Sequence, residues 1–138
     1  MAYFKKWRGK QVLDSVKRNV AQALGEFGLR AEGHSKKELR KGHGVETGTL
    51  RRSIHTAQPG YDWAGDNVQA GFGSPERGGK ATSAAISGDR VSLQLGSGLL
   101  YALAVHQGHH SFSGYHYLTN GLMKAKPEMP AVLKRHRL

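Results

Sequence analysis

The chain has 138 residues and no cysteine, and its 21 Lys and Arg against 10 Asp and Glu give a net charge of +11. This length supports one domain with a modest core, and the lack of cysteine excludes disulfides and thiolate metal sites. No stretch reaches the roughly 18–20 apolar residues of a membrane span, and no apolar run of signal-peptide kind follows Met1–Lys10. We therefore expect an intracellular protein, or one assembled from intracellular parts, whose partners are nucleic acid or acidic protein surfaces.

The first predicted element is a long amphipathic helix over Arg8–Ala31. Its apolar residues recur at spacings of three and four, which indicates one helix face: Val12, Val16, Val20, Ala23, Leu24, Phe27 and Ala31. Gly25 and Gly28 each weaken a helix by about 1 kcal/mol relative to alanine, so we expect a kink or an early end near Gly28 or Gly33. A further helical segment is predicted over residues 34–41, with Ser35 as its cap and a glycine-rich break after it.

Residues 1–9 form an N-terminal arm before this helix. Three aromatic residues stand there among basic ones: Tyr3, Phe4 and Trp7 beside Lys5, Lys6 and Arg8. Such a mixture can form a stacking platform for nucleic acid, and it can equally dock on a neighbouring subunit. We favour docking on a neighbour.

The segment Glu46–His55 changes from helical spacing to strand spacing. Thr47 or Thr49 can cap a short helical turn, because a threonine hydroxyl accepts a bond from an unpaired N–H group at a helix start. Gly48 permits a tight backbone path at little steric cost. The basic N-terminal part of the chain and its glycine-rich middle are therefore expected to meet here.

Within that turn, Leu50 and Ile54 are four residues apart and share one face. Arg51 and Arg52 then point away from that face. After Ile54 the spacing is no longer helical, and residues 53–57 read as a strand.

Two further strands are predicted, over Val68–Phe72 and around the alternating residues Val91, Leu93 and Leu95. Between them, Gly73–Arg90 consists mainly of Gly, Ser, Ala and charged residues. A connection of that length without structure of its own is usually functional or disordered, so we expect a long flexible loop.

The C-terminal part returns to helical spacing. One helix is predicted over Leu99–Gln107 and ended by Gly108, a second over Tyr117–Ala125, and a last turn opened by Pro130. Together these elements make a single α+β domain over residues 1–138: a long N-terminal helix, a small antiparallel sheet with a long flexible loop, a short helix and a C-terminal helix.

The sequence offers little for catalysis. The only cluster with the density of a metal site is histidine-rich: His106, His109, His110 and His116. No Asp or Glu between Arg90 and Glu128 is available to complete a site, and we favour a polar loop. No carboxylate pair, Gly-x-Ser-x-Gly elbow or phosphate loop is present. We expect no catalytic residue, no metal site, no cofactor and no enzyme activity.

Four features in chain order define a recognisable pattern. They are the long basic helix, the segment Thr47-Gly48-Thr49-Leu50-Arg51-Arg52-Ser53-Ile54, the pair Tyr101-Ala102 leading to His106-Gln107-Gly108, and the helix start Tyr117-Leu118. This pattern resembles the neck and tail-completion family of long-tailed double-stranded DNA phages, also called head–tail connector or minor tail morphogenesis proteins. Its signature residues here are Thr47, Gly48, Leu50, Arg51, Ser53, Ile54, Tyr101, Ala102 and Gly108. The family tends to have Glu-Phe-Gly or Glu-Tyr-Gly at residues 106–108, so this chain lacks a carboxylate there.

The resemblance implies a virion subunit that forms a ring, usually hexameric, at the head–tail junction after assembly in the host cytoplasm. Such a ring joins the connector, adaptor and stopper proteins to the tail terminator or tail tube and surrounds the passing DNA, with no membrane partner. Five basic residues are candidates for inter-subunit or DNA-channel contacts: Arg51, Arg52, Arg77, Lys80 and Arg90. We expect the loop Gly73–Arg90 to become ordered on assembly.

Alternatives remain at this stage. A net charge of +11 also suits a small DNA-binding protein that acts through phosphate contacts. A tail-terminator ring and a metal protein built on the histidine loop are weaker readings. The sequence leaves open which ring the chain forms and how many subunits it contains.

Overall fold

The computed structural model describes residues 9–41, 44–45, 48–66, 81–108 and 112–137. Its elements are, in order, α1 (Gly9–Glu38), β1 (Arg40–Lys41), β2 (Gly44–Val45), α2 (Thr49–Ser53), β3 (His55–Ala57), the 3₁₀ helix η1 (Trp63–Asp66), β4 (Ala85–Ser87), β5 (Arg90–Ser92), β6 (Gln94–Gly96), α3 (Ala102–Gln107), α4 (Tyr117–Ala125), the 3₁₀ helix η2 (Lys126–Glu128) and α5 (Met129–Arg135). The predicted α+β class is confirmed, with a long N-terminal helix, small antiparallel sheets and a C-terminal helix.

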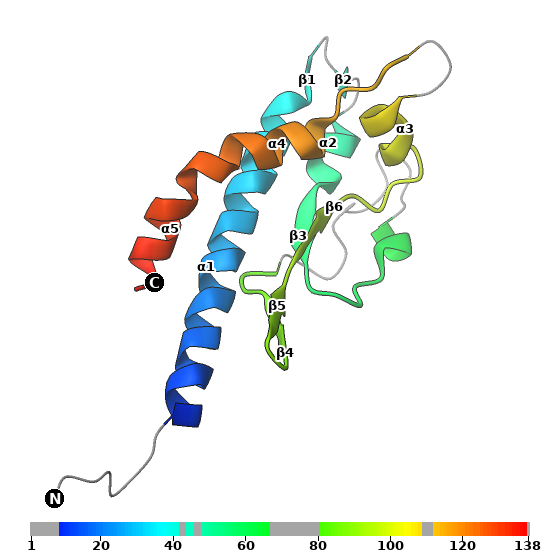
Figure 1. Ribbon diagram of the computed structural model, residues 1–138. Coiled ribbons are helices and arrows are strands. Elements are labelled where there is room, and N and C mark those ends of the chain that lie inside the picture. The colour runs from blue at the N-terminus through cyan, green and yellow to red at the C-terminus, as the bar shows by residue number, and fades with distance from the viewer. Residues whose placement is uncertain (1–8, 42–43, 46–47, 67–80, 109–111, 138) are drawn as a thin grey trace, which may run out of the picture.

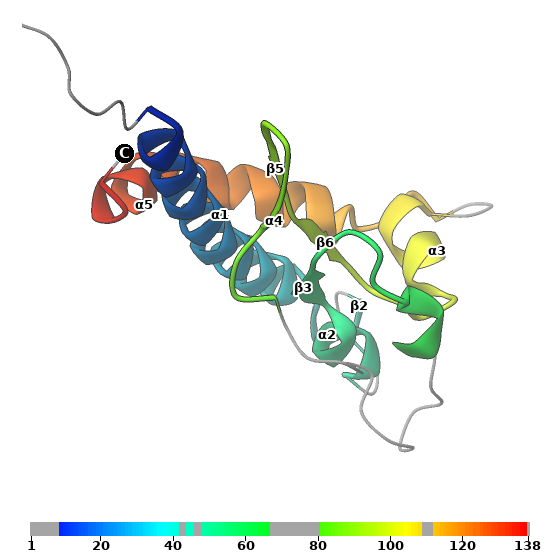
Figure 2. The ribbon, with the colours of Figure 1, turned by 90° about the horizontal axis from the view of Figure 1, so that it is seen from below.

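Helix α1 is the axis of the molecule. Its 30 residues make it about 45 Å long at about 1.5 Å per residue. Helices α4 and α5 pack along one side of it and the strands β3 to β6 lie on the other (Figure 1). Seen from below, α3 stands at the far end of the molecule from the first turns of α1 (Figure 2).

The predicted break in this helix is wrong. Helix α1 runs through Gly28 and Gly33 as far as Glu38, and Ser35 is a buried residue inside it rather than the cap of a second segment. Gly25 and Gly28 are needed for packing: a Cβ at Gly25 would lie 2.7 Å from the Thr82 carbonyl carbon. A Cβ at Gly28 would lie 3.0 Å from the Thr56 Cγ2 atom. The missing side chains therefore let the strand layer reach the helix backbone.

The change from helix to sheet after Gly48 is confirmed. Leu50 and Ile54 are buried, Arg51 and Arg52 are exposed, and β3 follows directly. The expected threonine cap is wrong for Thr49, which is the first residue of α2, and Thr47 lies outside the described residues. The N-cap is Gly48, with φ 79° and no side-chain cap bond, so the backbone enters the helix through a conformation that favours glycine.

The described strands form separate two-stranded ladders rather than one sheet. β3 pairs antiparallel with β6, β4 pairs antiparallel with β5, and the two-residue strands β1 and β2 are parallel. The predicted strand around Val91, Leu93 and Leu95 is thus divided at Leu93 between two ladders. β4 and β5 also correct the predicted loop Gly73–Arg90, because residues 85–90 form a hairpin. Residues 73–80 and the predicted strand Val68–Phe72 lie outside the described residues.

The C-terminal predictions are confirmed except for the start of the first helix, which is Ala102 rather than Leu99. α4 spans Tyr117–Ala125 as expected, α3 ends at Gln107 before Gly108, and Pro130 lies at the start of α5. Buried side chains form two clusters. One contains Leu39, Leu50, Ile54, Leu99, Ala102 and Tyr117, and the other contains Ala23, Phe27, Ala31, Ala125 and Val132. Leu95 of β6 packs against both clusters and connects them.

Candidate assembly surfaces

Three of the nine signature residues lie in the first core cluster. Leu50 of α2 and Ile54, directly after it, meet Ala102 of α3 and Tyr117 of α4 there. The Tyr117 hydroxyl donates to the Ala102 carbonyl at 2.9 Å, and burial, followed by the neighbouring Tyr101, raises the pKa of the Tyr117 phenol. These contacts hold α2, α3 and α4 together, which is a structural role.

Ser53 extends the same contact to the strand layer. Its hydroxyl donates to the Leu50 carbonyl at 2.6 Å and lies 2.6 Å from the Ser97 Oγ atom. The Ser97 hydroxyl in turn accepts a bond from the Leu99 N–H at 3.3 Å. The end of α2 is therefore bonded to the turn that leads from β6 into α3.

Glycine is required at position 108 for steric reasons. Its φ is 90°, and a Cβ there would lie 2.6 Å from the Ser113 carbonyl carbon. The chain folds back at this point, so that the N–H groups of Tyr115 and His116 donate to the carbonyls of Val105 and His106 at 3.0 and 2.9 Å. Only glycine fits this crossing without displacing backbone.

The structure does not bring together the three basic candidates that it describes. Arg51 and Arg52 are exposed on α2, whereas Arg90 begins β5, the second strand of the β4–β5 hairpin, on a different part of the molecule (Figure 1). Arg77 and Lys80 lie outside the described residues. Arg52 is close enough to Tyr101 that its charge offsets part of the rise that burial causes in the pKa of the Tyr101 hydroxyl.

The histidine-rich segment connects two helices. The His106 and His116 rings lie 5.4 Å apart, and the Thr119 N–H donates to the His106 Nε2 atom at 3.4 Å. Burial, followed by the charge of His116, lowers the pKa of His106, which favours the neutral ring that this bond requires. His109 and His110 lie outside the described residues, and the part of the chain that is described holds no group of three potential metal ligands.

A buried polar cluster was missed from the sequence. The His55 Nε2 atom lies 2.8 Å from the Asp66 Oδ2 atom with neither side chain exposed, and the Tyr61 hydroxyl donates to Asp66 Oδ1 at 2.6 Å. The Trp63 ring centroid is 4.8 Å from that of His55, and its indole N–H donates to the Gln94 side chain at 3.1 Å. His55 and Asp66 are fully buried in this cluster, and its bonds hold η1 against β3 and β6.

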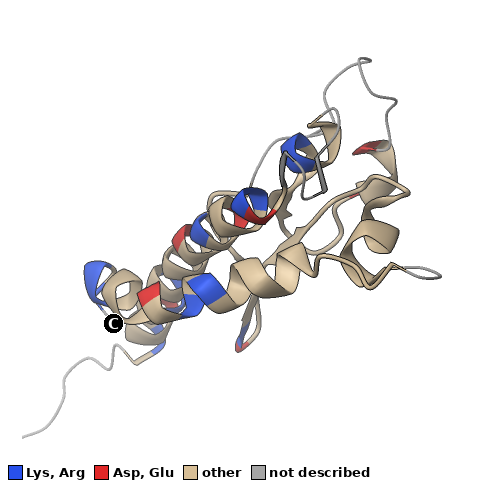
Figure 3. Cartoon of the chain, turned by 90° about the horizontal axis from the view of Figure 1, so that it is seen from above, with Lys and Arg blue, Asp and Glu red and all other residues tan. Residues whose placement is uncertain are grey.

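An uncharged region covers the α3 end of the molecule. From Val91 to Met123 the sequence contains no Asp, Glu, Lys or Arg, although charged residues make up 22% of the chain. Figure 3 shows α3 and the neighbouring turns without charge, in contrast to α1 and α5. Three exposed side chains of α3 and the turn before it form what we call the uncharged face: Leu100 (82%), Tyr101 (47%) and Leu103 (62%).

A second apolar surface lies on the first turns of α1. Val12, Leu13 and Val16, which we call the outer stripe, are 59%, 61% and 43% exposed. They continue the helix face whose inner residues Ala23 and Phe27 are buried in the second core cluster. The predicted amphipathic face is thus confirmed, but α4 and α5 cover only its inner part.

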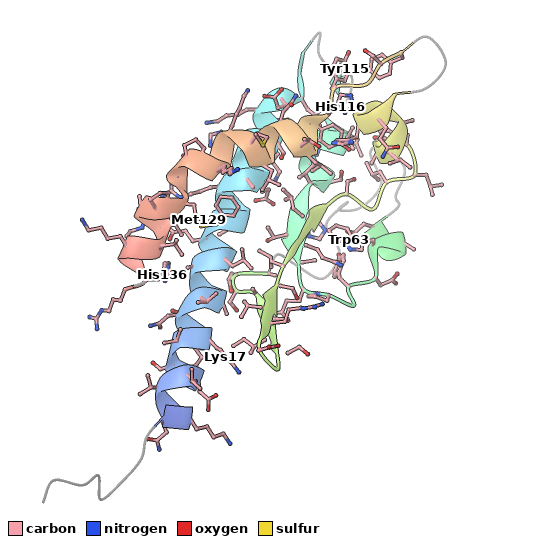
Figure 4. The ribbon with its side chains drawn as sticks, viewed as in Figure 1. Lys17, Trp63, Tyr115, His116, Met129 and His136 are labelled. Atoms are coloured by element: carbon pink, nitrogen blue, oxygen red, sulfur yellow. The ribbon has the colours of Figure 1, made fainter. Side chains whose placement is uncertain are left out.

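Ion pairs between α1 and the C-terminal part of the chain fix how far α4 and α5 extend along α1. Glu26 of α1 bonds Arg135 and, at 2.9 Å, His136, while Glu128 lies 3.5 Å from Arg30 and 3.1 Å from His34. Figure 4 shows His136 farther along α1 than Lys17, so the C-terminal helix stops before the outer stripe.

Glu26 also lines an open hollow of about 550 Å³ with Gln22, Leu29, Thr82, Arg135 and His136. Desolvation raises the pKa of Glu26, but the bonds from His136 and Arg135 and the charges of Arg135 and Arg30 outweigh it, and the pKa is lowered. The carboxylate therefore stays charged and keeps α5 in place.

Comparison of the chain with protein-family models, curated proteins and solved structures finds no match. No helix in the described ranges combines the length and hydropathy needed to cross a bilayer. The outer stripe and the uncharged face are the features of this structure that most directly concern function, since exposed apolar patches on a protein mark interaction sites.

Proposed function

We propose that this chain is the subunit of a homo-oligomeric ring in the neck of a long-tailed phage, where it completes the head–tail junction and surrounds the DNA channel. The observation that carries the proposal is the pair of different apolar surfaces at opposite ends of one subunit, the outer stripe and the uncharged face. Contacts between two different surfaces are head-to-tail, and such contacts close into rings when the rotation allows it.

Two further observations support this function. The segments that resemble the neck family, around Leu50 and Tyr101, pack with Tyr117 in one core cluster through Leu50, Ile54 and Ala102. The net charge of +11 suits a ring whose inner surface faces DNA or acidic partners. Arg51 and Arg52, both exposed on α2, remain our candidates for that surface or for a subunit contact.

A nonsense mutation in the gene, within the phage that encodes it, tests the proposal. We expect DNA-filled heads and separate tails of normal length, with joining restored when the purified protein is added to the extract. Tails of abnormal length would instead place the ring at the tail terminus. Normal infectious particles without the protein would contradict a neck function.

The net charge also favours a second candidate, a small DNA-binding protein. That function requires free protein to bind DNA with an affinity that falls steeply as salt rises, because each phosphate contact releases counterions. Replacing Arg51 and Arg52 by glutamine would then reduce the salt dependence. Assembly of the free protein without DNA affinity favours the ring.

A further inference from the structure

We propose that the uncharged face of one copy packs on the outer stripe of the next. The contact joins Leu100, Tyr101 and Leu103 of α3 and its preceding turn to Val12, Leu13 and Val16 of the following copy's α1. The inference rests on the proposed function for the existence of a homo-oligomer and adds which surfaces build it.

Charge indicates that the partner of the uncharged face is a second copy of this chain. Each copy carries +11, and juxtaposing like charges across an interface costs several kcal/mol. DNA or an acidic protein would be attracted to the basic surface and gains nothing from an uncharged one. Two copies of the same positive chain, in contrast, repel each other least where one of them presents no Lys or Arg, as from Val91 to Met123.

The composition of the two surfaces suits an interface core. Interface cores are depleted of charged residues and enriched in aromatic ones, with arginine among the preferred anchors. Tyr101 and two leucines provide the apolar centre, and Arg52, whose charge acts on Tyr101, marks the polar border.

The positions favour a head-to-tail contact over a symmetric one. The two surfaces lie at opposite ends of the subunit (Figure 2), so they cannot cover each other within one chain. A symmetric pairing of two uncharged faces would leave the outer stripe of each copy exposed. Head-to-tail packing buries both in every subunit of a closed ring.

Three matched variants test the contact: Leu103→Asp on the uncharged face, Val12→Asp on the outer stripe and Ile86→Asp on the β4–β5 hairpin as control. All three side chains are exposed in the subunit, at 62%, 59% and 43%, and each change lowers the net charge by the same amount. Far-UV circular dichroism checks folding, and Leu100→Asp or Val16→Asp replaces a variant that does not fold.

We expect wild type and Ile86→Asp to assemble alike, measured as native mass. Leu103→Asp and Val12→Asp should each need about 30-fold more protein or more to assemble, as for an interface hot spot. An equimolar mixture of the two should give a one-to-one dimer and nothing larger. The intact outer stripe of the Leu103→Asp chain can bind the intact uncharged face of the Val12→Asp chain, and the surfaces left over are both altered. Raising NaCl from about 0.1 to about 1 M should strengthen wild-type assembly, since it screens the repulsion.

Other outcomes separate the two proposals. If Val12→Asp assembles normally while Leu103→Asp does not, the contact is symmetric and the pairing is overturned. If both variants form rings, or the mixture stays monomeric, the pairing is also overturned while a wild-type ring supports the proposed function. A wild-type chain that stays monomeric at every concentration and salt overturns the ring itself.

Discussion

Replacing Gly25 of α1 by alanine, with Gly33→Ala as its matched control, tests the packing of the strand layer on this helix. Both glycines lie inside α1, so both changes gain the same helix propensity, about 1 kcal/mol. They differ in surroundings. A Cβ at Gly33 meets nothing within 4 Å, whereas a Cβ at Gly25 would lie 2.7 Å from the Thr82 carbonyl carbon and 2.8 Å from Ser83 Cα.

Backbone atoms cannot move aside by a rotamer change, so the Gly25 variant has to displace the segment around Thr82. Overpacking of this kind typically costs about 1–3 kcal/mol. Set against the gain of about 1 kcal/mol in propensity, Gly25→Ala should be neutral to about 2 kcal/mol less stable than wild type. Gly33→Ala should be about 1 kcal/mol more stable.

Urea unfolding followed by circular dichroism measures both changes. All samples need the same protein concentration, because assembly raises apparent stability. With a denaturant slope of about 2 kcal/mol per M, the Gly33 variant should unfold at about 0.5 M higher urea than wild type. Equal stabilisation by both substitutions would refute the close packing of β4, β5 and their flanking residues on α1.

Three further predictions concern single sites. Asp66→Ala should lower the free energy of unfolding in urea by about 3–5 kcal/mol, because His55 and Tyr61 lose a buried partner. As a control, Asp62 is exposed nearby, and Asp62→Ala should change that free energy by less than about 0.5 kcal/mol. Gly48→Ala should cost about 1 kcal/mol in the same assay, because its φ of 79° is unfavourable for alanine. The pKa of His106 is lowered in the folded chain from its ordinary 6.5, so the unfolded chain binds more protons just below that pH, and stability should fall as the pH drops through this window. His106→Asn should reduce the difference between urea midpoints at about pH 5 and about pH 7.5. An unchanged difference would contradict a neutral His106 ring that accepts the bond from the Thr119 N–H.

Much of the fold could be predicted because its signals are local. The four-residue spacing of Leu50 and Ile54 places both in the core, and Gly108 ends α3 where the backbone needs a positive φ. The bounds of α4 follow from the helical spacing of its own residues. Each of these features depends on residues within a few positions of one another.

The features that sequence reasoning missed depend on distant partners. Gly25 weakens an isolated helix, and only its contact with Thr82 shows that the missing side chain is needed for packing. Likewise, the partnership of His55 with Asp66 is invisible before η1 folds back on β3. The uncharged segment from Val91 to Met123 was readable in the sequence as a gap in charge, but its exposure was not.

The measurement that tests the central claim most directly is the native mass of the purified protein, combined with negative-stain images of the same sample. We predict a single closed assembly whose mass is a whole multiple of 15.1 kDa, seen end-on as a ring with an axial channel. A monomer, or an open polymer without a defined mass, at protein concentrations well above the micromolar range would contradict it.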